Sequence, residues 1–151
     1  MSSDALTPTE SIILTLLFSP GKNKKAEPIR GKISVAKQIF ILWKNPILSK
    51  RLDDIEFEPY DFGPWSDTIE VAIDELKARD LIKGTGTDPI IYSLTNKGKN
   101  DAMHLWNELS DQEKSIIIDV KRNLNSLTTK NLLRIIYSAY PEYAKESKYK
   151  F

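Results

Sequence analysis

Apolar residues recur at helical spacing in several segments of the chain, and three of these segments lie in its first half. A hydroxyl cap followed by proline at Thr7-Pro8 predicts a helix that ends before Ser19-Pro20-Gly21. The apolar stripe of the second segment predicts a deeply packed helix over Lys32–Lys44. A third helix is predicted over Asp67–Arg79, because Ser66 is a favourable N-cap residue in front of it.

After the third helix the pattern changes from helical spacing to short apolar runs. Leu81–Lys83 and Ile90–Leu94 flank a Gly- and Pro-containing turn, which predicts a β-hairpin. Three more helices are predicted at about residues 97–109, after the capping box that begins at Ser110, and at about residues 129–140. The tail 145–151 is expected to be frayed.

The predicted order of helix, helix, turn, helix and hairpin is that of a winged helix-turn-helix. The predicted fold class is therefore mainly α with a small β-hairpin (α+β). Residues 1–96 are expected to form the winged-helix core, and residues 97–151 a C-terminal helical extension packed on it in the same domain. The aromatic segment Phe57–Ser66, which contains Pro and Gly, is too rigid for a linker and is predicted to be a turn before the third helix.

Composition restricts the class of protein. The 151 residues are 40% hydrophobic and 28% charged, as in a globular domain, and there is no cysteine, which excludes disulfides and thiol chemistry. Met1 to Thr9 carries no signal-peptide pattern, and the longest apolar run, Ile12–Phe18, is too short to cross a bilayer. A soluble, cytoplasmic protein without a membrane partner is expected.

The residue types needed for catalysis are not grouped along the chain. His104 is the only histidine, and Asp101 and Glu108 lie at helical spacing from it, which favours a solvated ion pair over a catalytic or metal-binding role. The sequence Gly84-Thr85-Gly86-Thr87 lacks the lysine and the following helix of a phosphate loop. We therefore expect no enzyme activity, no cofactor and no metal site.

Two segments carry a resemblance to known families. Gly31–Phe40 reads GKISVAKQIF and Phe57–Ser66 reads FEPYDFGPWS. Together with Tyr92–Gly98, which resembles the exit from a wing, they resemble the SocA-like (Panacea) antitoxin and YwgA-like families, over roughly residues 30–147. The resemblance implies a helix-turn-helix scaffold and a role as a toxin-neutralising antitoxin or an adaptor. Val35 stands where those families commonly have leucine, and the lysine-rich loop at 22–28 is not part of their pattern.

Charge leaves the partner open between DNA and protein. The net charge is only +1, and the outward face of the third helix is acidic, although this helix reads the major groove in many winged helices. The first interhelical loop is basic and suits either phosphate contacts or simple solubility. The candidate DNA-binding residues are Lys22, Lys24, Lys25, Arg30, Lys32, Ser66, Thr68, Lys77 and Lys83.

A protein partner would instead contact acidic, apolar and aromatic side chains. The candidate protein-interface residues are Asp67, Glu70, Val71, Asp74, Ala78, Tyr60, Trp65, Tyr137 and Tyr140. The aromatic residues among them have two interpretations, as core residues or as interface anchors, and the last helix is a candidate homodimer contact. The predicted function is a winged-helix DNA-binding protein that regulates transcription; the alternative is an antitoxin- or adaptor-like protein-interaction module that does not bind DNA.

Overall fold

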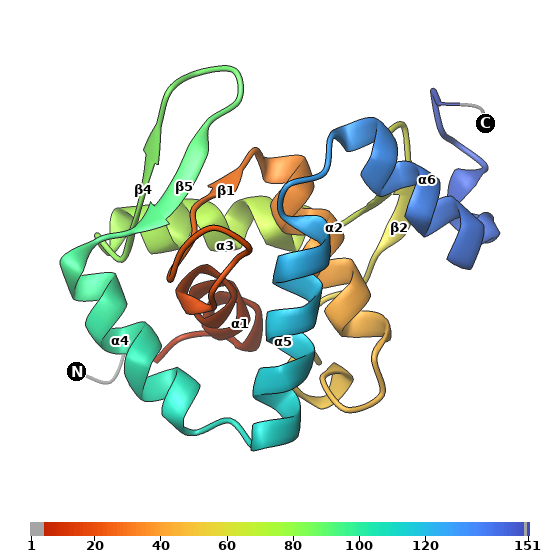
Figure 1. Ribbon diagram of the computed structural model, residues 1–151. Helices are drawn as coiled ribbons and strands as arrows, with labels where there is room; N and C mark the ends of the chain where they lie inside the picture. Colours follow the sequence, from red (N-terminus) through yellow and green to blue (C-terminus); the bar gives the residue numbers. More distant parts are fainter. Residues whose placement is uncertain (1–4, 150) are drawn as a thin grey trace.

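The computed structural model describes residues 5–149 and residue 151, which form an α+β fold (Figure 1). Most of the described chain is helical, with short antiparallel strands between the helices. In chain order the elements are α1 (Pro8–Phe18), β1 (Ile29–Arg30), α2 (Lys32–Lys44), the 3-10 helix η2 (Ser49–Arg51), β2 (Glu58–Tyr60), β3 (Gly63–Trp65), α3 (Asp67–Ala78), β4 (Ile82–Thr85), β5 (Ile91–Leu94), α4 (Asn96–Asn107), α5 (Asp111–Leu124), α6 (Thr129–Ala139) and the 3-10 helix η3 (Pro141–Ala144).

The helices begin at the capping residues that the sequence indicates. Thr7 and Ser110 each open a complete capping box, in which the hydroxyl accepts from the third helical N–H and a glutamate accepts from the cap N–H. Ser66 and Thr95 cap α3 and α4 with their hydroxyl oxygens. Each predicted helix lies within about two residues of its observed bounds, because these caps satisfy backbone donors that would otherwise lack partners.

The predicted hairpin is present and belongs to a three-stranded sheet. β4 and β5 pair antiparallel, with Ile82 opposite Leu94. β1, which the sequence did not predict, adds to the other side of β5 and gives the order β1–β5–β4. Beyond the sheet, the β4–β5 turn extends away from the body of the molecule, at the upper left of Figure 1.

Helix α1 lies at the centre of the molecule (Figure 1). Every residue from Thr9 to Leu17 except Ser11 is buried, and α1 contacts α2, α3, α4, α5 and β5. The helices of the predicted C-terminal extension thus complete the same core instead of forming a second one. Despite its apolar surface α1 has only 11 residues, and within the described chain no helix is long and apolar enough to span a bilayer.

The segment predicted as a rigid aromatic turn is a two-stranded hairpin, β2–β3. Glu58 lies opposite Trp65, and Tyr60 lies opposite Gly63. The hairpin packs against α2, α6 and η3. The chain after η3 returns to this hairpin, where the Lys148 N–H donates to the Asp61 carbonyl at 2.8 Å. The prediction of a frayed tail is therefore wrong for residues 145–149, because the tail contacts the hairpin directly.

Candidate functional site

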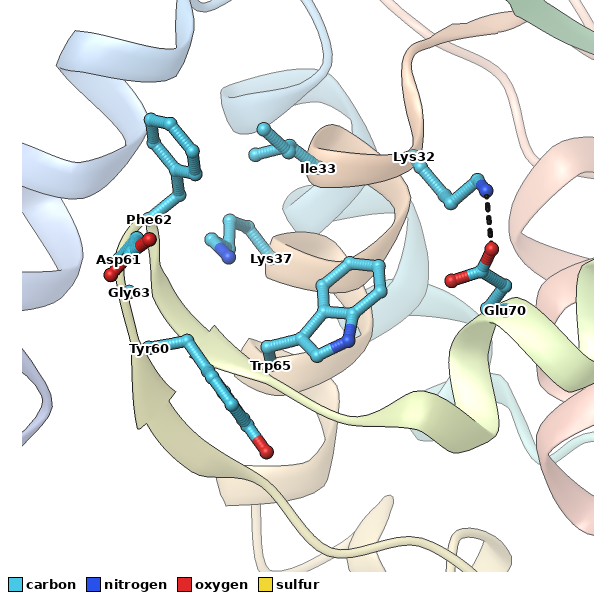
Figure 2. Close-up of a pocket in the computed structure, with 9 residues that line it drawn as sticks. All are labelled: Lys32, Ile33, Lys37, Tyr60, Asp61, Phe62, Gly63, Trp65 and Glu70. Atoms are coloured by element: carbon cyan, nitrogen blue, oxygen red, sulfur yellow. Dashed lines mark hydrogen bonds and ion pairs between the residues drawn. The ribbon is translucent and has the colours of Figure 1, made fainter. Parts of the chain in front are cut away.

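A surface pocket of about 420 Å³ lies between α2, the β2–β3 hairpin and the start of α3. We call it the hairpin pocket, and Figure 2 shows its lining. It is lined by Lys32, Ile33, Lys37, Tyr60, Asp61, Phe62, Gly63, Trp65 and Glu70. Most of this surface is apolar and aromatic, with a small number of charged groups, which is the composition expected of a binding pocket.

Lys37 lies at the inner wall of the hairpin pocket and is only 1% exposed. Its Nζ donates to the Pro64 carbonyl at 2.8 Å and lies 5.9 Å from the centre of the Trp65 ring. Burial lowers the pKa of Lys37 to about 7, because the charged form loses its hydration. The Lys37–Pro64 bond joins the two segments, Gly31–Phe40 and Phe57–Ser66, that carry the family resemblance.

Gly63 permits the close packing beneath the pocket. Its φ of +82° lies in the region that favours glycine. A Cβ at this position would lie 2.6 Å from Cδ2 of Leu133 and 3.4 Å from Cε of Lys37. Glycine at this position therefore lets the β2–β3 hairpin pack closely against both α6 and the aliphatic stem of Lys37.

Aromatic side chains form the outer rim of the hairpin pocket. Tyr60 is 45% exposed and Phe62 is 37% exposed, both high values for large hydrophobic residues. Trp65 is half-buried, and its Nε1 donates to Oδ1 of Asp67 at 3.1 Å. This bond links the rim directly to the first turn of α3. Half-buried aromatic groups of this kind are the usual anchors of protein interfaces.

The outward face of α3 continues from this rim. Helical spacing predicts the inward stripe, and the structure buries Ile69, Ala72, Ile73 and Leu76. The opposite side exposes three acidic residues and two apolar ones, of which Val71 is 66% exposed. We call this surface the α3 face; it comprises Asp67, Glu70, Val71, Asp74 and Ala78. A 3.1 Å ion pair from Lys32 to Glu70 joins it to the hairpin pocket (Figure 2).

The candidate DNA-binding residues come from several different elements. Lys22, Lys24 and Lys25 are exposed in the loop between α1 and β1, Arg30 is exposed on β1, and Lys77 and Lys83 are exposed on α3 and β4. Lys32 is bound to Glu70. Ser66 is buried and Thr68 is half-buried. The Ser66 hydroxyl accepts from the Thr68 N–H at 3.3 Å, so Ser66 is the helix cap of α3.

The tyrosines of the last helix turn inward. Tyr137 is buried and its hydroxyl donates to Oγ of Ser147 at 2.6 Å; burial raises the pKa of this phenol. Tyr140 is half-buried and meets the Phe40 ring edge-on, with 5.4 Å between centroids. Of the two interpretations of Tyr137, burial and the bond to Ser147 favour the core residue. Both tyrosines therefore make contacts within this chain, Tyr137 with Ser147 and Tyr140 with Phe40 of α2.

Sequence reasoning overlooked Lys37, although a signal for it exists. Lys37 lies four residues after Ile33 and three before Phe40, so it falls on the buried side of α2. A lysine on an apolar stripe indicates either a solvated stem or a buried amine with a specific acceptor.

Compared with known proteins, the chain matches no protein-family model and no curated protein.

Proposed function

We propose that this chain is a protein-binding module on a winged helix-turn-helix scaffold. The order α1, β1, α2, α3, β4, β5, with the β2–β3 hairpin inserted between α2 and α3, supports the scaffold together with the sheet order β1–β5–β4. A winged helix places its hairpin directly after the third helix. The resemblance to the SocA-like and YwgA-like families supports the same role, because antitoxins and adaptors act by binding proteins. The scaffold by itself does not select a partner.

The observation that carries the proposal is the continuity of the hairpin pocket with the α3 face. The pocket offers exposed Tyr60 and Phe62 around an apolar floor. The adjoining helix exposes Asp67, Glu70 and Asp74; Asp67 also accepts from Trp65, and Glu70 pairs with Lys32. The complementary partner segment carries one bulky apolar side chain for the pocket and Lys or Arg residues beside it for the carboxylates.

The charge of α3 favours a protein over a DNA duplex at this surface. Phosphates repel carboxylates, and most of the affinity for DNA comes from Lys and Arg contacts to phosphates. Glu75 is also exposed but is paired with Arg79 at 2.9 Å, and Lys77 is the exposed base of the same helix. A basic, amphipathic protein segment meets the same surface without this repulsion.

The test is selection from a random peptide display library on the immobilised full chain. We expect the recovered peptides to combine a large apolar residue with flanking Lys or Arg. Asp74→Lys should reduce their affinity at least about tenfold, because it places a like charge against the peptide. Tyr60→Ala should reduce it by a similar factor, because it removes an aromatic anchor.

The matched control is Asp119→Lys, which reverses an exposed aspartate on α5 instead of α3. It should leave the affinity unchanged. Peptides without basic residues, or peptides whose binding survives both Asp74→Lys and Tyr60→Ala, would contradict the proposal. Thermal unfolding of each variant verifies that the fold is intact.

Binding to duplex DNA, with a role in transcription regulation, is the second candidate. The exposed lysines at 22, 24 and 25 and the exposed Arg30 favour it. Its test is a titration with mixed-sequence duplex at about 50 and 200 mM salt, in which phosphate contacts appear as a steep fall in affinity. Lys24→Glu with Lys25→Glu should abolish that binding, and wild-type affinity in this variant would exclude the loop as the contact.

A further inference from the structure

A second surface pocket, of about 550 Å³, is built around two aromatic rings that are distant in sequence. Phe18 at the end of α1 and Trp106 in α4 have ring centroids 5.9 Å apart, with planes inclined at 53°. Both rings are half-buried. Each therefore keeps part of its surface in contact with solvent, where a flat ligand ring can stack. We call this the loop pocket.

Four cations line the loop pocket. Lys22, Lys24 and Lys25 come from the loop after α1, and Arg122 comes from α5; all four are exposed. None of the described residues that line it is acidic. In the hairpin pocket, by contrast, two lysines are balanced by Asp61 and Glu70. The positive potential of the loop pocket is therefore not cancelled by its own lining.

The loop is held in place from beneath by Glu27. Its carboxylate accepts from the Asn23 N–H at 3.0 Å and from Nδ2 of Asn125 at 2.8 Å. Burial raises the pKa of Glu27, but these hydrogen bonds outweigh it and keep the pKa below its ordinary value. A Cβ at Gly21 would lie 2.4 Å from this carboxylate, so glycine lets the loop close over it. The cations are thus presented on a fixed loop, which lowers the entropy cost of binding.

We propose that the loop pocket binds single-stranded nucleic acid, with a base stacked on Trp106 and the adjacent phosphates paired with the loop lysines and Arg122. Proteins that bind single strands combine a basic surface with aromatic rings for unpaired bases. Bases inside a duplex are already stacked and offer no free face to a ring. The aromatic pair therefore adds affinity for a single strand and none for a duplex. This proposal uses no residue of the hairpin pocket or the α3 face. The single-strand proposal and the protein-binding proposal can therefore fail independently.

The test measures fluorescence anisotropy of an end-labelled oligothymidine of about ten nucleotides with the full chain. Between about 50 and 200 mM salt the affinity should fall about 20- to 50-fold, as expected for three or four phosphate contacts to a single strand. Trp106→Ala should weaken binding about tenfold or more, while Trp106→Phe should keep most of it. Binding should also quench wild-type tryptophan fluorescence, and Trp106→Phe should remove most of that quenching.

The matched control removes the same charge from elsewhere on the surface. Lys24→Gln with Lys25→Gln should weaken binding at least tenfold, whereas Lys77→Gln with Lys83→Gln should change it less than twofold. Equal affinity for a duplex of the same length would overturn the proposal and favour backbone contact alone. Equal competition by polyglutamate, or full quenching in Trp106→Phe, would overturn it as well. The fluorescence readout remains decisive if Trp106→Ala does not fold.

Discussion

A buried lysine lies at the inner wall of the hairpin pocket and another beside the loop pocket, but the two are held differently. Lys37 donates to one carbonyl, that of Pro64. Lys121, in α5, donates to the carbonyls of Leu16, Leu17 and Ser19 at 2.7, 3.4 and 3.0 Å. It thereby satisfies the free carbonyls at the C-terminal end of α1, from which the basic loop departs.

The hairpin pocket and the loop pocket both lie next to a buried lysine, but their surfaces differ in charge. The hairpin pocket is aromatic and balanced in charge and adjoins an acidic helix, whereas the described lining of the loop pocket has four cations and no acid. Support and recognition therefore reside in different residues. Buried amines fix the backbone, and the exposed side chains are those that the two proposals assign to partner contacts. Substitutions at the two levels should accordingly have separable effects on stability and on binding.

The largest expected effect is a rise in stability with pH. Burial lowers the pKa of both Lys37 and Lys121 to about 7, while each lysine titrates near 10.5 when unfolded. Between these values the unfolded chain holds more protons, so the free energy of unfolding increases with pH. We expect on the order of 2 kcal/mol for each lysine between about pH 7 and 9. Urea unfolding at several pH values measures this rise.

Single-lysine variants apportion that rise between the two pockets. Lys37→Met and Lys121→Met should each remove about half of the pH dependence, since methionine does not titrate. Above about pH 9 the raised pKa values of Tyr92, Tyr137 and Tyr143 act in the opposite direction. A flat profile in the wild-type chain would show that both amines keep ordinary pKa values when folded.

At a fixed pH of about 8.5 the two substitutions should differ in cost. At this pH the neutral Lys121 amine has two N–H groups for its three carbonyl partners, so Lys121→Met should lower the free energy of unfolding by about 2 kcal/mol. Lys37→Met removes one such bond and should cost about 1 kcal/mol. Urea unfolding curves provide the comparison. Equal costs would mean that the number of carbonyls does not determine the contribution of the amine.

Each pocket also depends on a glycine, and here the larger cost is expected at the hairpin pocket, the reverse of the order for the lysines. Gly63→Ala combines a φ of +82° with a Cβ 2.6 Å from Leu133, and should cost about 2 kcal/mol. Gly21→Ala meets only the carboxylate of Glu27, which can turn away at the loss of a hydrogen bond, so about 1 kcal/mol is expected. Thermal unfolding distinguishes them, and a larger loss at Gly21 would reverse the ranking.

The smallest expected effects on stability belong to the exposed charges. Lys32 and Glu70 form an ion pair with side chains 33% and 51% exposed. Lys32→Ala should therefore change the free energy of unfolding by about 0.5 kcal/mol or less. Lys24→Ala, in the exposed loop, should do the same. A loss above about 1 kcal/mol at either position would contradict the separation of support from recognition.

The helices could be predicted from the sequence, but several strands could not. Helix caps such as Thr7 and Ser110 act on neighbouring residues, so local pattern is sufficient. β1 has two residues and exists because it pairs with β5, which is about sixty residues away in sequence. In β2–β3, Pro59 and Pro64 lie opposite each other, and proline in a short segment is more typical of a turn.

The candidate site divides in the same way. The exposed α3 face follows from helical spacing, and the sequence predicted its acidic character. The acceptor of Lys37 is a backbone carbonyl 27 residues away, and no side-chain pattern encodes such a partner. The tilted contact of Phe18 with Trp106 depends on the packing of α1 against α4, which is set by tertiary structure. Both features required three-dimensional information.

The two buried lysine amines can also report local opening of the fold through chemical labelling. Acylating reagents modify a lysine only when its amine reaches solvent, so Lys37 and Lys121 react only when their surroundings open. Lys37 then records separation of the hairpin from α2, and Lys121 records separation of α5 from the end of α1. Mass spectrometry of the two labelled peptides would give separate opening rates for the two halves of the fold, without any engineered probe.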